Sequence, residues 1–295
     1  MHHSLKVIGV FAALIASTFH ANAEVVAVDD TGRTISLSKP ANRVVSMAPN
    51  ITEILFHVGA GPQIVGVVEY SDFPPEAQEI TSVGSSNQFD LEAILLLQPD
   101  LIIAWDSGNP AEDIRKLEDL GLAVYRSEPR TLEDVASTMD RLAALTGHKA
   151  HGEAQSQLFR KHTSEIRGAY ENRLNLRVFY QIWSDPIYTL NGDHLISRLV
   201  EGCGGTNIFS DAETLAPIVS TEAVIDRNPE VIIAGGYAGE PPKWLNEWNQ
   251  WSSIAATANG HLYTVNTDRI SRMGPRLVEG MRELCESIDK ARPQG

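Results

Sequence analysis

The sequence predicts an α/β protein of two similar lobes, each with a mainly parallel sheet flanked by helices. One long backbone helix is expected to join the lobes, with a ligand cleft between them. Three observations predict this fold. One helix–strand pattern occurs in residues 91–105 and again in 221–235. Short apolar runs alternate with amphipathic stretches, which is typical of βα units. Residues 148–173 form a long polar stretch of helical periodicity with no strand inside it.

The repeated pattern suggests that the two lobes correspond to each other. In each copy a Glu-Ala pair and an apolar segment lead to a proline, an acid and an apolar run. Glu92 and Glu222 suit the first turn of a helix, because a carboxylate is stabilised at the positive end of the helix dipole. The proline stops each helix, and the all-apolar run favours a strand buried on both faces of a parallel sheet. Chance similarity is the alternative interpretation.

The N-terminus predicts export. Lys6 precedes an apolar run at residues 7–16, which has the length of a signal-peptide core and is too short to span a bilayer. Ala21-Asn22-Ala23 forms a cleavage site of the small-x-small kind. We therefore expect a signal peptide at 1–23, a mature chain that begins at Glu24, and a periplasmic location. A short membrane anchor is the alternative.

Composition restricts the possible partners. The formal net charge of -14 argues against nucleic-acid binding through bulk electrostatics. Cys203 and Cys285 are the two cysteines of the chain, and both remain after cleavage. An oxidising compartment favours a disulfide between them, which would lie within the second half of the chain. Two free buried thiols are the alternative.

The N-terminal lobe is expected at residues 24–147. A turn at 29–32 predicts a hairpin over 25–37. Apolar runs bounded by turn residues predict core strands at 43–47, 64–68, 101–105 and 122–125. Helical periodicity, together with cap and stop residues such as Thr131 and Gly147, predicts helices at 51–58, 91–98, 111–120 and 132–145.

The linking helix is expected at residues 148–173, where Phe159 and Ile166 recur at helical spacing. The C-terminal lobe is expected at 174–295. Its predicted strands lie at 177–182, 231–234 and 262–265, and its predicted helices at 195–201, at the start of the second repeat and at 275–288. An aromatic segment with Trp244, Trp248 and Trp251 precedes the last strand.

Aromatic residues gather in the loops that follow the predicted strands. In open α/β sheets, ligands bind beyond the carboxyl ends of the strands. These loops contain Tyr70, Phe73, Trp105, Trp183 and Tyr188, and Asp268, Arg269 and Arg272 follow the last strand. Aromatic walls with a few polar groups fit a large, partly apolar ligand with hydrogen-bonding edges. We therefore predict a ligand site from these residues; aromatic caps on the core are the alternative.

Signatures of catalysis and of metal binding are missing. The chain has neither a nucleophile elbow nor a phosphate-binding glycine loop with lysine, so we assign no catalytic residue and expect no enzyme. His148 and His151 lie three residues apart, but no carboxylate or cysteine accompanies them, which favours a solvated helix face over a metal site. His57, His194 and His261 show no ligand spacing, although one of them could be an axial ligand. We expect no cofactor of the protein's own.

Four segments resemble the helical-backbone substrate-binding proteins of ABC importers, whose members carry cobalamin, iron-siderophores or haem. Residues 43–53 (RVVSMAPNITE) and 203–209 (CGGTNIF) are specific to this superfamily. Residues 70–75 (YSDFPP) and 101–105 (LIIAW) narrow the resemblance towards its cobalamin branch. The resemblance covers nearly all of the mature chain, and it implies that Cys203 and Cys285 form a disulfide.

The resemblance also implies roles for side chains. Tyr70, Trp105 and Tyr188 would contact a corrinoid. Glu92 and Glu222 would lie on the two lobe surfaces that dock to the permease, each facing an arginine cluster. The chain departs from the cobalamin branch at two positions, because that branch has tryptophans where this chain has the residues Ser86 and Ala216. These departures bear on the identity of the ligand.

Together these observations predict an exported, monomeric, non-catalytic substrate-binding protein. It would capture cobalamin or a related corrinoid between its lobes and deliver it to a dimeric inner-membrane ABC permease. A haem or ferric-siderophore binder of the same superfamily is the first alternative, and Arg269 and Arg272 keep a siderophore in consideration. A periplasmic hydrolase or metalloenzyme is the alternative from another class.

Overall fold

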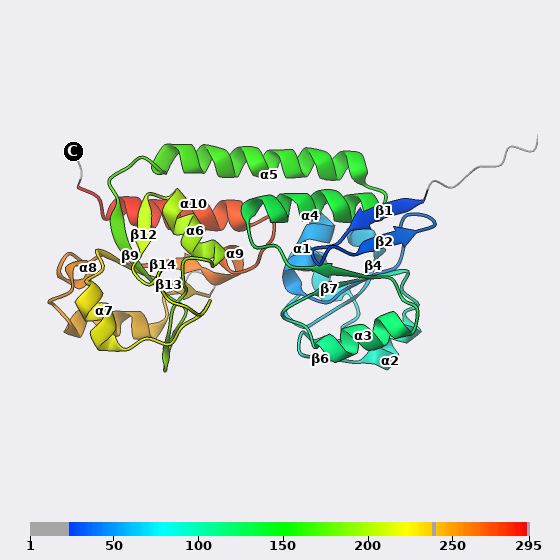
Figure 1. Cartoon of the computed structure of the whole chain (residues 1–295), viewed down its shortest axis with the longest axis horizontal. Helices are drawn as coiled ribbons and strands as arrows, with labels where there is room; N and C mark the ends of the chain where they lie inside the picture. The colour runs from blue at the N-terminus through cyan, green and yellow to red at the C-terminus, as the bar shows by residue number, and fades with distance from the viewer. Residues whose placement is uncertain (1–23, 238–239, 294–295) are drawn as a thin grey trace, which may run out of the picture.

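A computed structural model describes residues 24–237 and 240–293. The predicted signal peptide, residues 1–23, lies outside the described residues. Figure 1 shows two α/β lobes on the same side of one long helix, α5 (Lys149–Tyr170). Within the described ranges, no helix combines the length and the apolar character that a membrane span requires.

The N-terminal lobe is built on a four-stranded parallel sheet in the order β4-β3-β7-β8. Its strands are short and largely buried: β3 (Val44–Ser46), β4 (Ile64–Val67), β7 (Leu101–Trp105) and β8 (Val124–Ser127). The helices of this lobe are α1 (Pro49–His57), α2 (Leu91–Leu96), α3 (Ala111–Asp119) and α4 (Leu132–Leu145). A separate hairpin of β1 (Val25–Val28) and β2 (Thr34–Leu37) begins the lobe, as the turn residues predict.

The C-terminal lobe has a second four-stranded parallel sheet in the order β12-β9-β13-β14. Its strands are β9 (Leu176–Gln181), β12 (Gly205–Asn207), β13 (Val231–Gly236) and β14 (Leu262–Asn266). The helices are α6 (Leu195–Gly202), α7 (Thr221–Arg227), α8 (Ala255–Ala258), α9 (Thr267–Ile270) and α10 (Leu277–Lys290). The aromatic segment forms a 3₁₀ helix, η3 (Lys243–Gln250), and β10 (Trp183–Ser184) pairs with β11 (Ile187–Tyr188) in a short hairpin.

The two sheets have the same connectivity. When the strands of each sheet are counted in the order in which they occur along the chain, their order across the sheet is second, first, third, fourth in both lobes. The repeated sequence occupies the same place in both lobes, because α2 leads into β7 and α7 leads into β13. This correspondence confirms the predicted fold class of two similar α/β lobes.

Helix α5 packs against both lobes. Its buried residues recur every three or four positions, and they contact α4 of the N-terminal lobe and α10 of the C-terminal lobe. Gly152 permits the close contact with α4, since a Cβ atom at this position would lie 2.1 Å from the Cβ of Ala143. Further along α5, Phe159 and Ile166 belong to an apolar core that includes residues of both lobes.

The predicted disulfide is confirmed. Cys203 and Cys285 are bonded with an S–S distance of 1.99 Å, and both residues are fully buried. The bond joins the end of α6 to the middle of α10, so both halves of the crosslink lie in the C-terminal lobe.

Several elements differ from the sequence prediction. Strand β12 has the sequence Gly-Thr-Asn and no apolar side chain, so it gave no strand signal. The strand predicted at 122–125 is Val124–Ser127, and the helix predicted at 91–98 ends at Leu96. The short helix α9 and the β10–β11 hairpin were also missed, because neither is long enough to have a clear hydrophobic period.

Candidate functional site

A cavity of about 340 Å³ opens at the carboxyl ends of strands β9 and β13. Its wall includes the side chains of Ile182, Trp183 and Tyr237, which are 37%, 58% and 69% exposed. Tyr180 is fully buried below them, and burial raises the pKa of its hydroxyl. The cavity therefore combines exposed aromatic groups with a closed floor, at the edge of the sheet where α/β proteins bind ligands.

The N-terminal lobe presents a matching set of aromatic residues. Tyr70 follows β4, has a positive φ of 64° and is 74% exposed. Phe73 in the same loop is 41% exposed, and Trp105 at the end of β7 is 40% exposed. Trp105 ends β7 and the other two follow β4, so all three lie at the carboxyl edge of the parallel sheet, as predicted.

Two arginines of the C-terminal lobe connect these edges. The carboxylate of Glu53, on α1, accepts hydrogen bonds from Arg276 Nε at 2.8 Å, Arg276 Nη2 at 2.6 Å and Arg272 Nη1 at 3.1 Å. Glu53 is only 3% exposed. The Arg276 guanidinium also lies over the Phe73 ring, 4.1 Å from its centroid. The lobes therefore contact each other through a buried ion-pair network.

Arg272 extends this network towards the loop that contains Tyr70. Its Nη1 donates to Asp72 Oδ1 at 2.7 Å, and its Nη2 pairs with Asp268 at 3.0 Å. Burial alone would raise the pKa of Asp72, but the hydrogen bond and charge of Arg272 outweigh burial and lower it. Asp268 and Arg272, both predicted as ligand contacts, are thus paired with each other, and Arg272 is also paired with two acids of the opposite lobe. Glu53 and Arg276 were not predicted as site residues.

Asn109 fixes the position of Trp105. Its Oδ1 accepts the backbone N–H of Trp105 at 2.7 Å, while its Nδ2 donates to the carbonyls of Met47 and Ser86, each at 3.0 Å. Gly108 is required beside the indole, because a Cβ there would lie 1.9 Å from the Trp105 ring. The turn after β7 is therefore shaped around the tryptophan.

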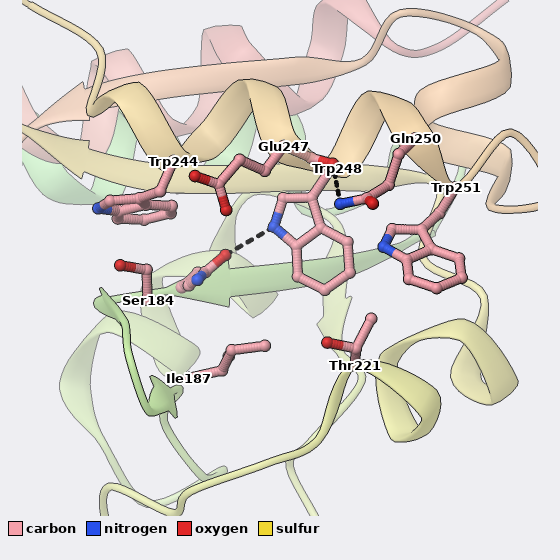
Figure 2. Close-up of a pocket in the computed structure, with 9 residues that line it drawn as sticks. Ser184, Ile187, Thr221, Trp244, Glu247, Trp248, Gln250 and Trp251 are labelled. Atoms are coloured by element: carbon pink, nitrogen blue, oxygen red, sulfur yellow. Dashed lines mark hydrogen bonds between the residues drawn. The ribbon is translucent and has the colours of Figure 1, made fainter.

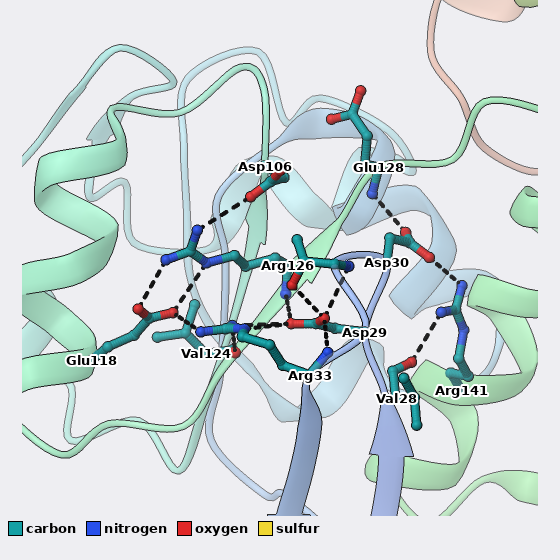
Figure 3. Close-up of polar contacts among 11 residues, drawn as sticks. Val28, Asp29, Asp30, Arg33, Asp106, Glu118, Val124, Arg126, Glu128 and Arg141 are labelled. Atoms are coloured by element: carbon teal, nitrogen blue, oxygen red, sulfur yellow. Dashed lines mark hydrogen bonds and ion pairs between the residues drawn. The ribbon is translucent and has the colours of Figure 1, made fainter.

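A polar network lies beside the same turn, and Figure 3 shows its contacts between Arg126, Asp106 and Glu118. Glu128 accepts from the backbone N–H and the hydroxyl of Ser107, both at 3.0 Å. Arg126 pairs with Asp106 at 3.4 Å and with Glu118 at 2.9 Å. Burial alone would raise the pKa of Glu118, but hydrogen bonds from Arg126 and from Arg33, which directly precedes β2, lower it.

The β10–β11 hairpin holds the remaining predicted aromatic residues. Trp183 and Tyr188 are directly opposite partners in this antiparallel pair, so their side chains share one face of the hairpin. Trp183 lines the cavity and its Nε1 donates to the carbonyl of Asp185 at 3.1 Å. Tyr188 is half-buried and bridges to Ile218.

Tyr237 and Trp244 were missed by the sequence prediction. Tyr237 directly follows β13, the counterpart of β7, so the rule that located Trp105 could also have located Tyr237. Trp244 lines the cavity from η3 and was recognised only as part of an aromatic segment.

Glu92 and Glu222 occupy equivalent positions in α2 and α7. In each helix the N-cap side chain, Asp90 or Ser220, accepts the backbone N–H of the third helical residue, at 2.9 Å and 3.2 Å respectively. Both glutamates are exposed, and α2 and α7 lie on the side of the lobes away from α5 (Figure 1). Hydrogen bonds from its own backbone N–H and from Ser220 lower the pKa of Glu222.

The histidines lie elsewhere. His148, at the start of α5, is half-buried, and its Nε2 lies 2.9 Å from Gln63 Oε1. It is therefore not the fully solvated residue that the sequence predicts. Burial, and secondarily the nearby His151, lowers the pKa of His57. His194 caps α6, and His261 contacts the carbonyl of Glu230 at 3.2 Å. Across residues 24–237 and 240–293, no three His, Cys, Asp or Glu side chains are grouped as a metal site would need.

Comparison with known proteins identifies sequence relatives. The family model of the periplasmic binding proteins matches residues 44–268. The vitamin B12-binding protein of Vibrio parahaemolyticus is 35% identical over 256 residues, which cover 86% of this chain and 92% of that protein. The vitamin B12-binding protein of Pectobacterium carotovorum is 35% identical over 253 residues, which cover 85% of this chain and 90% of that protein.

Solved structures share the fold. The periplasmic vitamin B12 binding protein BtuF of Vibrio cholerae is similar with a TM-score of 0.79 and 34% identity, covering 86% of this chain and 99% of BtuF. The periplasmic heme-binding protein BhuT, in complex with two hemes, has a TM-score of 0.75 and 19% identity, covering 84% of this chain and 98% of BhuT. At that identity the likeness to BhuT concerns the fold alone.

Proposed function

This chain belongs to the periplasmic binding proteins, and from that premise we propose that it captures cobalamin or a related corrinoid between its lobes. In this proposal it is a monomeric, non-catalytic carrier that delivers the ligand to a dimeric ABC permease in the inner membrane. Its signal peptide is removed after Ala23 and it works in the periplasm. The 35% identity to proteins named for vitamin B12 binding supports the ligand class.

The observation that carries the proposal is the exposure of large aromatic side chains at the carboxyl edges of both sheets. Tyr70 and Trp105 supply them from one lobe, and Trp183 and Tyr237 from the other. Soluble proteins rarely leave such groups clustered unless a partner covers them. A corrinoid has broad apolar faces and amide groups at its edges, and aromatic rings with polar tips suit both.

The two departures from the cobalamin branch affect the walls of the site. The carbonyl of Ser86 accepts a hydrogen bond from Asn109, so this residue lies beside the Trp105 turn without supplying a ring. In the C-terminal lobe, Tyr237 and Trp244 add aromatic surface near the cavity, although Ala216 replaces a tryptophan. These differences favour a corrinoid held in a somewhat altered position over loss of corrinoid binding.

Docking to the permease is the second part of the proposal. Glu92 and Glu222 are exposed acids at matching positions of matching helices, and α2 and α7 lie on one side of the molecule. A two-fold symmetric permease presents the same surface twice, so a carrier with two equivalent lobes suits it. Opposite charges across that contact would guide association.

Haem and ferric siderophores are the alternative ligands. A haem-binding site usually provides an axial His, Cys, Met or Tyr, and none of His57, His194 and His261 is part of the described cavity wall. Tyr70 and Tyr237 are then the exposed candidates. The two arginines that could suit an anionic siderophore already have partners, because Arg272 is paired with Glu53, Asp72 and Asp268, and Arg269 with Glu279 and Glu283.

Gel filtration with absorption detection tests the ligand class. The mature protein is mixed with cyanocobalamin, haem or a ferric siderophore, and each mixture is passed through the column. We expect the corrinoid bands to elute with the protein, and Trp183→Ala to reduce the bound fraction. Leu120→Ala is the matched control, since Leu120 is an exposed apolar residue at the end of α3. If haem or the siderophore elutes with the protein and the corrinoid does not, the corrinoid proposal is wrong and the alternative ligand takes its place. Assays of zinc content and hydrolase activity test the metalloenzyme alternative.

A further inference from the structure

A second, smaller cavity lies beside the first one. Its volume is about 70 Å³, and it is lined by three indole rings, Trp244, Trp248 and Trp251, together with Glu247 and Gln181 (Figure 2). Trp244 also lines the larger cavity. Successive residues of an extended chain point to opposite sides, which is why Gln181, the last residue of β9, lines the small cavity while its neighbours Tyr180 and Ile182 line the large one.

One of the three tryptophans of this cavity, Trp248, is held firmly. Trp248 is 5% exposed, and its Nε1 donates to Gln181 Oε1 at 2.7 Å. Gln181 is itself 2% exposed, and its Nε2 donates to the carbonyl of Trp183 at 3.0 Å. The Trp248 ring also packs edge-on against Phe179, with ring centroids 5.6 Å apart. The part of the cavity wall that Trp248 and Gln181 form is therefore preformed.

The charge in this cavity is a single carboxylate among aromatic rings. Figure 2 shows the Glu247 side chain extending from η3 into the interval between Trp244 and Trp248. Lys243, the basic residue of η3, lines the larger cavity instead. Within the described part of the chain, no lysine, arginine or histidine forms an ion pair with Glu247, whereas Asp72 and Asp268 at the sheet edges are paired with Arg272.

We propose that this tryptophan cage, formed by Trp244, Trp248, Trp251 and Glu247, binds a small organic cation such as a quaternary ammonium or guanidinium group. Aromatic faces attract cations, and a carboxylate beside them adds a direct charge–charge attraction. By the usual requirement of about 10–15 Å³ for one water, the cavity holds roughly five heavy atoms. That room suits a trimethylammonium or guanidinium head and excludes a corrinoid macrocycle.

The cation can come from two sources. It can be a free solute, or it can be a cationic group of a larger ligand that extends past Trp244 from the first cavity, because Trp244 lines both. The binding chemistry is the same in either case. The proposal does not depend on the corrinoid function, and its first test uses protein without any other ligand.

Titration with tetramethylammonium chloride tests the cage. Sodium chloride keeps the ionic strength constant, and the indole N–H signals of the five tryptophans are followed by NMR in ¹⁵N-labelled mature protein. We expect saturable shifts at Trp244 and Trp251 that are absent with tert-butanol, a neutral molecule of similar shape. Glu247→Gln should weaken binding about tenfold. Glu286→Gln is the matched control, since it removes the same charge from an exposed position on α10.

Three results would overturn the proposal: no saturable shift, equal binding of tert-butanol, or equal affinity in the Glu247→Gln variant. The source of the cation is then tested by repeating the titration with cyanocobalamin-saturated protein. Unchanged binding identifies a free-solute site, and competition shows that a ligand in the first cavity reaches the cage past Trp244. The corrinoid proposal is judged separately by co-elution, so the two can fail independently.

Discussion

Replacing Glu53 by glutamine should destabilise the protein far more than its single lost charge suggests. The Glu53 side chain is 2% exposed, and it accepts three hydrogen bonds from two guanidinium groups that are each 15% exposed. Removing one partner of a buried ion pair costs about 3–5 kcal/mol, because the remaining charge stays buried without compensation. Arg272 keeps Asp72 and Asp268 as partners. We therefore expect the lower end of that range, about 3 kcal/mol.

Urea unfolding at neutral pH measures this loss, and the chain offers a matched control. Glu133 also accepts three hydrogen bonds from one arginine, Arg160, but its side chain is 65% exposed. Glu133→Gln should cost less than about 1 kcal/mol, since exposed ion pairs contribute little. A cycle with Arg276→Met isolates the coupling to Glu53. Equal losses from Glu53→Gln and Glu133→Gln would refute the reasoning, because burial would then have no effect on the pair.

Four further predictions concern the cleft, the docking surface and the response to pH. Trp105→Ala should weaken corrinoid binding by about 1–3 kcal/mol through lost apolar contact, measured by calorimetry; unchanged affinity in a folded variant would remove Trp105 from the site. The double change Glu92→Gln and Glu222→Gln should leave corrinoid affinity nearly unchanged and reduce transport in reconstituted vesicles more than either single change; full transport would leave the glutamates as helix-start residues only. Small-angle scattering should give similar radii with and without ligand, since α5 and the Glu53 network resist closure, and a large compaction would contradict this. The folded-state pKa values of Asp72 and Glu118 lie below their ordinary values. The two ionised carboxylates therefore stabilise the folded protein fully at pH values above their unfolded-state pKa of about 4. This stabilisation is lost as the pH falls through their folded-state pKa values. The urea midpoint should therefore drop on acidification, less steeply in an Asp72→Asn, Glu118→Gln variant.

The core of both lobes could be predicted from the sequence for a simple reason. Strands β7 and β13 are buried on both faces, so nearly every side chain in them must be apolar. This apolar run can be recognised in the sequence of each strand without knowing which strands pair with it. The short strand β12 is the opposite case. Its backbone pairs with β9, but its residues Gly-Thr-Asn reveal nothing about that pairing.

The site was predicted only in part, because its polar members act through distant partners. Aromatic residues after strands could be located by the rule for α/β sheets, and Tyr70, Trp105 and Trp183 do lie at those edges. Glu53, in contrast, is buried by arginines 219 and 223 positions away, and nothing local in the sequence marks such a pair. The role of Asn109 likewise depends on carbonyls from two other segments.

The apolar core has a consequence for how the molecule opens in solution. One cluster of buried side chains runs from Ile51 in the N-terminal lobe, through Phe159 and Ile166 on α5, to Val178 and Leu199 in the C-terminal lobe. Amides in the central strands of both lobes should therefore exchange with deuterium only through one shared global opening. The loop after β4 lies outside that cluster, so it can exchange faster and rearrange around a ligand while the two lobes remain a single cooperative unit.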